Sequence, residues 1–151
     1  MQVNSIVQAV LFFCLMGYAA YTDIKKREIP PIICCLVVAI SFLDFKAVHL
    51  LGILAALPFL IIAVWIAPNR LGGGDIKLVA ATGLVLGLQG TNYGIIIGLI
   101  FQVLAFCIYA LIKKIKRQEA RSISLPLAPC LTIGFLTIYF MKIGGIIHEF
   151  I

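Results

Sequence analysis

The stretch NRLGGGDIKLVAATGLVLGLQG, residues 69–90, decides how this chain folds. Three consecutive glycines and a single acid, Asp75, lead into an apolar run in which a carboxylate is costly. From Ile76 to Gln89 this run has about 14 residues, whereas a helix that crosses a bilayer needs roughly 20. The helix reaches that length only if it includes Asp75 and the glycines. We therefore expect the carboxylate to lie near membrane depth rather than in a free loop.

The rest of the chain also has the composition of a membrane protein. Of its 151 residues, 63% are hydrophobic and only 12% are charged, and the mean hydropathy is +1.15. Soluble domains are nearer half apolar and a quarter charged. The excess of 12 Lys and Arg over 6 Asp and Glu is typical of cytoplasmic loops, and the aromatic residues are not interleaved with basic ones. We therefore expect the lipid bilayer, and no nucleic acid, as a partner.

Hydropathy predicts an all-α fold, a polytopic membrane bundle of about six transmembrane helices that forms a single domain over residues 1–151. The first apolar stretch lacks a basic leader and is longer than a signal-peptide core, so we expect it to remain as a span. Short breaks separate the spans, including LQGTNY at residues 88–93. The predicted spans cover about residues 3–22, 30–45, 47–67, 73–90, 93–113 and 125–142.

Basic residues are distributed unevenly between the two sides of this bundle. Lys46 follows the second span and Lys142 ends the sixth, whereas the other ten Lys and Arg residues follow spans one, three and five. Because Lys and Arg collect on the cytoplasmic side, we expect a plasma-membrane protein with cytoplasmic odd-numbered loops and both termini outside. The ten residues are Lys25, Lys26, Arg27, Arg70, Lys77, Lys113, Lys114, Lys116, Arg117 and Arg121.

Small residues recur at four-residue spacing in the predicted fourth and fifth spans. The series comprises Gly83 and Gly87, then Gly90, Gly94 and Gly98. In lipid this spacing lets helix backbones approach closely. We therefore expect these glycines to lie at helix–helix contacts.

No cofactor or metal is expected from the sequence. The glycines before Asp75 match neither G-x-x-x-x-G-K-[ST] nor G-x-G-x-x-G, so they do not predict a nucleotide site. The cysteines lie in apolar segments without a C-x-x-C pair, which predicts small buried hydrophobic residues rather than zinc ligands or disulfides. They are Cys14, Cys34, Cys35, Cys107 and Cys130.

Two of the six acids differ from the others in their position. Asp23 ends the first apolar span and Asp75 begins the fourth, on the same predicted side of the membrane. One interpretation is that each acid reaches the interface and pairs with a nearby lysine, for example Asp23 with Lys26. The other four acids are expected to be solvated: Glu28, Asp44, Glu119 and Glu149.

A functional interpretation is that Asp23 and Asp75 act as a pair. Two adjacent carboxylates cannot both ionise cheaply, so they share a proton and can serve as base and acid together. Such a pair can hydrolyse a peptide without a metal or a covalent intermediate. The chain contains no H-E-x-x-H or Ser-His arrangement, and His49 and His148 are predicted on the outer side.

The three glycines before Asp75 have a predicted role in this site. Without side chains, Gly72, Gly73 and Gly74 let a substrate backbone or the opposing helix approach Asp75. They also permit backbone dihedrals that are closed to other residues.

Three motifs in this order resemble those of type IV prepilin peptidases, a family of G-x-G-D membrane aspartic proteases. GGGDIKL at residues 72–78 resembles the G-x-G-D-x-K-L signature of that family. DIKKREIPP at residues 23–31 resembles its first motif, an Asp followed by a basic stretch and Ile-Pro-Asn, with Pro31 where Asn is usual. LPLAPCLTIG at residues 125–134 is similar to its late Pro-x-Ala/Gly-Pro segment.

This resemblance implies a function and a set of site residues. Asp23 and Asp75 would be catalytic, and Gly72, Gly74, Lys77 and Pro30 would support the site. The family cuts the basic leader from prepilin-like precursors at the cytoplasmic membrane face. Large members carry an N-terminal extension with C-x-x-C motifs linked to N-methylation. We expect a peptidase-only form, similar to the enzymes of tight-adherence pilus systems or archaeal preflagellin peptidases.

Other functions remain open on the sequence. A small proton-coupled transporter or channel could use Asp23 and Asp75 as an ion relay, although such proteins often carry midplane charges and internal repeats. A presenilin-like protease would share the chemistry but cut within a span. A noncatalytic membrane assembly subunit is the third alternative.

Overall fold

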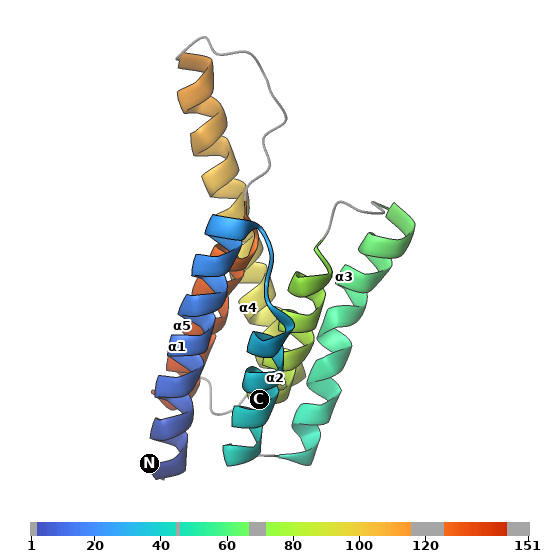
Figure 1. The fold of residues 1–151 in the computed structure, drawn as a ribbon, viewed down its shortest axis with the longest axis vertical. Coiled ribbons are helices and arrows are strands. Elements are labelled where there is room, and N and C mark those ends of the chain that lie inside the picture. The colour runs from blue at the N-terminus through green and yellow to red at the C-terminus, as the bar shows by residue number, and fades with distance from the viewer. Residues whose placement is uncertain (1–2, 45, 67–71, 116–125, 145–151) are drawn as a thin grey trace.

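A computed structural model describes residues 3–44, 46–66, 72–115 and 126–144, and the described chain is helical without strands. This confirms the predicted all-α class. The helices are arranged along one common direction (Figure 1). They are α1 (Val3–Lys26), α2 (Pro31–Ser41), η1 (Phe42–Asp44), η2 (Ala47–Ala56), α3 (Leu57–Ile61), η3 (Ile62–Ile66), α4 (Gly73–Ile115) and α5 (Ala128–Ile143).

Several of these helices are apolar enough to lie in a membrane. Among the described residues, three runs have the length and composition to cross a bilayer: Ser5–Lys26, Ala47–Trp65 and Gly73–Lys114. Pro31–Asp44 and Ala128–Ile143 are shorter apolar helices. Large hydrophobic side chains are exposed along them, and Trp65 reaches 84% exposure. Because such a surface needs an apolar solvent, the chain is an integral membrane protein.

The chain reverses its direction inside α4. Gly87 has φ 77° and ψ 173°, a conformation that only glycine adopts readily. Before this residue, Val85 O accepts a hydrogen bond from Lys142, near the end of α5. After it, a Cβ on Gly94 would contact Phe135 and one on Gly98 would contact Leu131, progressively nearer the start of α5. The two limbs of α4 therefore run in opposite directions (Figure 1).

These two limbs correspond to the predicted fourth and fifth spans, but the predicted break between them is wrong. Residues 88–93 are helical, and the reversal lies at Gly87. Thr91, which is fully buried, donates its hydroxyl to Gly87 O at 2.7 Å and so satisfies a carbonyl beside the bend. The first limb, from Gly73 to Leu86, has about 14 residues and is about 21 Å long, shorter than the bilayer core.

Glycines allow backbones to meet at the helix contacts, as predicted for most of the series. A Cβ on Gly83 would collide with the backbone of Gly52 in η2, and Gly94 lies against Gly134 in α5. Replacing these hydrogens by methyl groups would separate the helices. Gly87 instead forms the chain reversal.

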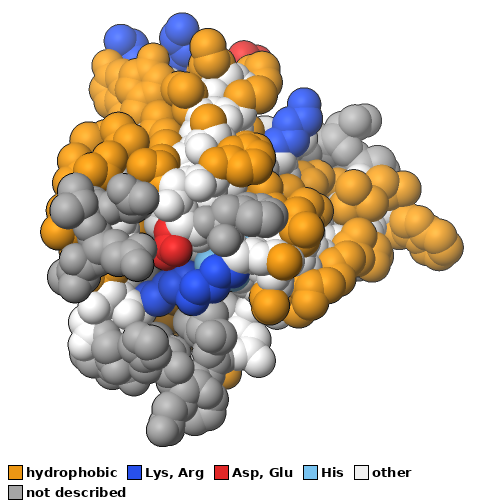
Figure 2. All heavy atoms as spheres, turned by 90° about the horizontal axis from the view of Figure 1, so that it is seen from below, with side chains coloured by type: hydrophobic (Ala, Val, Ile, Leu, Met, Phe, Trp, Pro, Cys, Tyr) orange, Lys and Arg blue, Asp and Glu red, His pale blue; other side chains and the backbone are white. Residues whose placement is uncertain are grey.

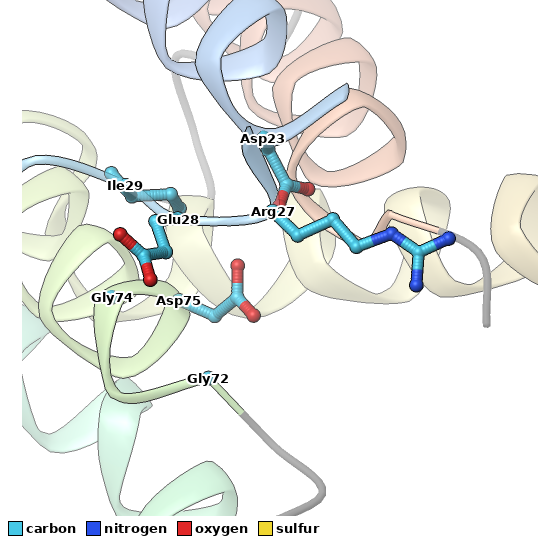
Figure 3. A pocket seen from close by; sticks show the side chains of 7 residues that line it. All are labelled: Asp23, Arg27, Glu28, Ile29, Gly72, Gly74 and Asp75. Atoms are coloured by element: carbon cyan, nitrogen blue, oxygen red, sulfur yellow. The ribbon is translucent and has the colours of Figure 1, made fainter. Parts of the chain in front are cut away.

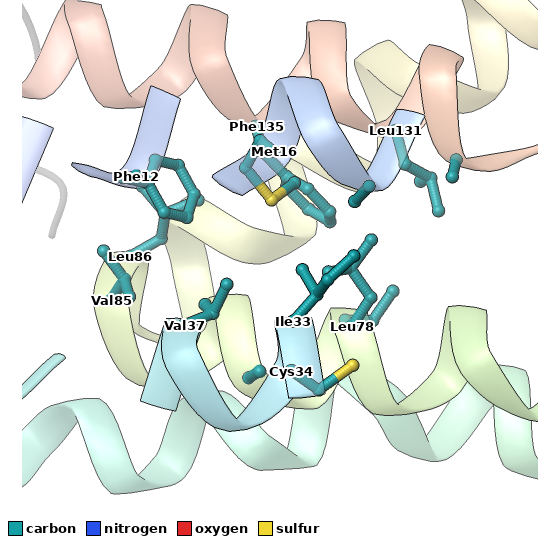
Figure 4. Close-up of a cluster of buried hydrophobic side chains, with 14 of the residues drawn as sticks. Phe12, Met16, Ile33, Cys34, Val37, Leu78, Val85, Leu86, Leu131 and Phe135 are labelled. Carbon is teal, nitrogen blue, oxygen red and sulfur yellow. The ribbon is translucent and has the colours of Figure 1, made fainter. Parts of the chain in front are cut away.

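The buried centre of the bundle is apolar and lies between four helices (Figure 4). Phe12 and Met16 of α1, Val37 of α2, Leu78 of α4 and Phe135 of α5 are fully buried there. This packing fixes the position of α1 relative to the first limb of α4. It therefore also determines where the acids near the ends of those helices lie.

Polar groups gather at one end of the bundle, beneath this core (Figure 2). Lys46, Lys142, Asp44 and His49 are close enough to interact electrostatically. This is the end where α5 finishes. Asp23 lies at the other end, where α5 begins, and Asp75 lines the same cavity as Asp23.

The cysteines depart from the predicted burial. All five are free, and only Cys34 is buried. Cys130 is half-buried, whereas Cys14, Cys35 and Cys107 are exposed on helix surfaces. A thiol behaves as a small hydrophobic group, so an apolar membrane segment accommodates it equally well on its outer face.

Candidate active site

Asp23 and Asp75 line one cavity although they lie 52 positions apart in the chain. Asp23 is in the last turns of α1, and Asp75 is in the first turn of α4. The cavity has a volume of about 220 Å³. The carboxylate groups of the two aspartates point into it from opposite walls (Figure 3). Its lining residues are Asp23, Arg27, Glu28, Ile29, Gly72, Gly74 and Asp75.

The carboxylate of Asp23 is held by the start of α5. Asp23 is only 7% exposed, and its Oδ2 accepts a hydrogen bond of 2.9 Å from the backbone N–H of Ala128. Ala128 begins α5, where N–H groups have no partner inside the helix. The hydrogen bond satisfies one of these N–H groups and fixes the orientation of the carboxyl group. Asp23 therefore faces the bundle rather than the interface, which disfavours the surface pairing considered above.

Asp75 is held differently, in the first turn of α4. Its backbone N–H donates to Gly72 O at 3.1 Å, and its side chain is half-buried. The buried Oδ1 has no hydrogen-bond partner among the described residues. The two aspartates are close enough to interact electrostatically. An unpaired buried carboxylate oxygen beside a second carboxylate is positioned to bind water or a substrate group.

The glycines before Asp75 have separate surroundings. A Cβ on Gly74 would lie 3.0 Å from Ile29 Cβ and 3.3 Å from Ile29 O, so the α1–α2 connection approaches here. A Cβ on Gly72 would lie 3.1 Å from Asp75 Oδ2, whereas one on Gly73 would meet nothing within 4 Å. None of the three has a positive φ, so the predicted use of special dihedrals is wrong.

The connection between α1 and α2 forms one wall of the cavity. Arg27 adopts φ 55°, and its N–H donates to Asp23 O at 2.9 Å, which ends α1. Pro30 stands just before α2, and its carbonyl accepts the N–H of Ile33 at 3.0 Å. Pro31 follows at the first position of α2, where the fixed φ of proline favours a helix start. Pro30 therefore lies beside the site but outside the cavity lining.

Two charged residues lie where the sequence did not predict them. Glu28 is exposed as expected, yet it also lines the cavity. Glu28 follows Asp23 by only five positions in the sequence. The structure was needed to show that the turn at Arg27 brings both carboxylates to one cavity. Lys77 is exposed and does not line the cavity, because residues two apart on a helix point in different directions. Its support of the site stays a prediction.

The arrangement suits acid–base chemistry. In the part of the chain that the structure describes, no three His, Cys, Asp or Glu side chains come together as a metal site. Asp23 accepts a hydrogen bond from the backbone N–H of Ala128, whereas the Oδ1 of Asp75 has no partner among the described residues. Two carboxylates in such unequal surroundings can divide the roles of base and acid toward one water molecule.

The fold and the cavity define an integral membrane protein with an aspartate pair contributed by two different helices. Residues 10–113 match the family model of the type IV leader peptidase family. This match extends over more than half of the chain, and the chain belongs to that family.

A curated relative is similar over most of this chain. The prepilin leader peptidase/N-methyltransferase of Bacillus subtilis (strain 168) is 33% identical over 138 residues. The similar region covers 87% of this chain and 54% of the relative, so the chain spans about half the length of that protein. No solved structure matches the chain.

Proposed function

We propose that this protein is a membrane aspartic endopeptidase that removes the leader peptide from type IV prepilin-like precursors. Asp23 and Asp75 are the catalytic residues. The observation that carries the proposal is their position on opposite walls of one cavity, with one carboxylate bound by Ala128 N–H and the other unpaired at Oδ1. Family membership and the name of the Bacillus subtilis relative support the choice of substrate.

The unequal surroundings of the two aspartates suggest different roles in the reaction. Asp23, whose carboxyl group is held by the N–H of Ala128, serves as the base and removes a proton from water as the water oxygen bonds to the peptide carbonyl carbon. Asp75, which carries the proton that the pair shares, donates it to the carbonyl oxygen. As this intermediate collapses, Asp75 takes a proton back from one of its two hydroxyls while the C–N bond breaks and the proton on Asp23 passes to the leaving amine, which returns both aspartates to their starting states. No metal or covalent intermediate is required.

The distribution of charge supports a cytoplasmic site in the plasma membrane. Ten of the twelve Lys and Arg follow odd-numbered spans, on the side of the two aspartates. Both termini then lie outside. Lys46 and Lys142 lie together at the opposite end of the bundle. A leader peptide that is still in the cytoplasm would reach the cavity, while the apolar segment that follows it remains in the bilayer.

The test is cleavage of a prepilin-like precursor, a basic leader followed by Gly and an apolar segment, by the purified protein in lipid vesicles. Asp23→Asn and Asp75→Asn should each abolish cleavage while the protein still inserts and folds, because neither change adds charge to an apolar span. Near-normal cleavage by Asp75→Asn would exclude the pair.

The matched control is Asp44→Asn, an acid at the other end of the bundle. This variant should cleave like the wild type. A proton-coupled transporter would show the reverse pattern, with no cleavage by any variant and a proton flux that depends on Asp23 and Asp75. Measuring vesicle acidification in the same preparation therefore separates the two functions.

A further inference from the structure

Glu28 is a third carboxylate at the cavity, and the reaction proposed above does not use it. The side chains of Arg27 and Glu28 leave the backbone in opposite directions (Figure 3), as the left-handed φ of 55° at Arg27 allows. Both residues line the cavity with Asp23 and Asp75. The Glu28 carboxylate thus lies on the wall formed by the α1–α2 connection, beside the dyad but not part of it.

This carboxylate has no partner in the described part of the protein. Glu28 is exposed, and no hydrogen bond or ion pair is formed by its side chain there. The neighbouring Lys25 is engaged elsewhere, since its Nζ donates to Tyr21 OH at 3.3 Å and lies 5.6 Å from the centre of that ring. A negative group at the opening of a cavity is therefore available to a ligand.

The chemistry of the cavity selects the kind of ligand. Three carboxylates, those of Asp23, Glu28 and Asp75, line the cavity together with one guanidinium, that of Arg27. Acidic groups therefore outnumber basic ones, and the cavity favours a cation over an anion. A small metal ion does not fit, because these three do not come together as a metal site among the described residues. A Lys or Arg side chain needs only one carboxylate and reaches it from a distance along its own flexible stem.

We infer that Glu28 is a specificity-determining residue, whose carboxylate binds a Lys or Arg side chain of the peptide while the dyad cuts that peptide. This inference rests on the proposed function. In this role Glu28 contributes to substrate binding and takes no part in the chemical step, which belongs to Asp23 and Asp75. Its contribution depends on the charge of the substrate, which a purely structural role would not.

The experiment is a double-mutant cycle between enzyme and substrate in vesicles. Wild type and Glu28→Gln are compared on two precursors, one with Lys residues in its leader and one with each of these Lys replaced by Gln. Glu28→Gln should lower kcat/KM for the Lys leader by about tenfold, mostly through KM, as expected for one charge-assisted pair. For the Gln leader the two enzymes should differ by less than about twofold.

Charge reversal gives a second, independent measurement. Glu28→Lys should cleave a precursor with Glu in place of the leader Lys faster than it cleaves the original precursor, which inverts the wild-type preference. Binding of uncleaved precursor to Asp75→Asn should weaken by a similar factor when Glu28→Gln is added. Asp44→Asn serves as the control, because its charge lies at the opposite end of the bundle and should not alter leader preference.

The outcomes separate this inference from the proposed function. If the wild type cleaves the Lys leader and Glu28→Gln cleaves it with the same kcat/KM, the role of Glu28 is overturned, and the proposed function stands. An equal loss on both leaders would also overturn it, since the residue would then act on the structure. If the wild type cleaved neither precursor, the proposed function and this role would both be rejected.

Discussion

Gly74 and Gly73 form a matched pair of substitutions that tests how closely the α1–α2 connection must approach the proposed catalytic aspartates. Both glycines lie in the first turn of α4, next to Asp75, so Ala has the same helix propensity at either position. Their surroundings differ, because a Cβ on Gly74 would meet Ile29 Cβ at 3.0 Å, whereas one on Gly73 would meet nothing within 4 Å. The pair therefore isolates the contact with Ile29.

The size of the effect follows from this contact. Carbon atoms pack at about 3.5–4.0 Å, so Gly74→Ala creates an overlap of about 0.5–1 Å. Ile29 is 8% exposed, and its Cβ is fixed to the backbone, so no rotamer change relieves the overlap. The connection must move away from α4, at a cost of about 1–3 kcal/mol in folding free energy. Since a shift of 1 Å can cost about 100-fold in rate, we expect kcat/KM to fall about 10- to 100-fold.

The assay is the initial rate of precursor cleavage in vesicles at matched protein levels. Gly73→Ala should remain within about twofold of wild type, because its methyl group enters open space and Ala favours the helix by up to about 1 kcal/mol. Equal, mild losses at both positions would refute the reasoning. The glycines would then act only as a flexible joint, and the close approach of Ile29 would not matter for cleavage.

Two further substitutions test the fold that positions the site. Gly87→Ala should lower the free energy of unfolding by about 1–3 kcal/mol, because alanine is strained at φ 77° and ψ 173°. The measurement is thermal unfolding in detergent, with Gly17→Ala, at an open position, as the control. An unchanged melting temperature for Gly87→Ala would contradict the reversal. Tyr139→Phe should cost about 1 kcal/mol, since it removes the 3.1 Å hydrogen bond to buried Gln8 Oε1, while the same change at exposed Tyr93 should be neutral.

The structure also explains why some sequence predictions failed near the site. Glu28 was expected to be a solvated loop residue, and its exposure agrees with that, but the turn at Arg27 also brings it to the cavity. The prediction that the cysteines are buried failed for a different reason. An apolar pattern identifies residues that avoid water, but it does not distinguish residues in the protein core from residues that face lipid.

The reversal in α4 was predicted at the wrong residue. Residues 88–93 contain most of the polar groups between the fourth and fifth spans, so hydropathy indicated a break there. The chain instead turns at Gly87 and buries Thr91 against the carbonyl of that glycine. Backbone conformation decided this position, and the glycine spacing, which predicted only helix packing, did not reveal it.

By itself the sequence determined the solvent of this protein, the approximate spans and the two acids, Asp23 and Asp75, that line the cavity. Hydropathy and charge act residue by residue, so a run of apolar residues selects lipid wherever the helices finally lie. The tertiary structure alone decided which groups come into contact. Asp23 accepts a hydrogen bond from the N–H of Ala128, 105 positions away, and Ile29 packs closely against Gly74. Such contacts depend on how whole helices pack around Phe12 and its neighbours, and no local pattern encodes that geometry.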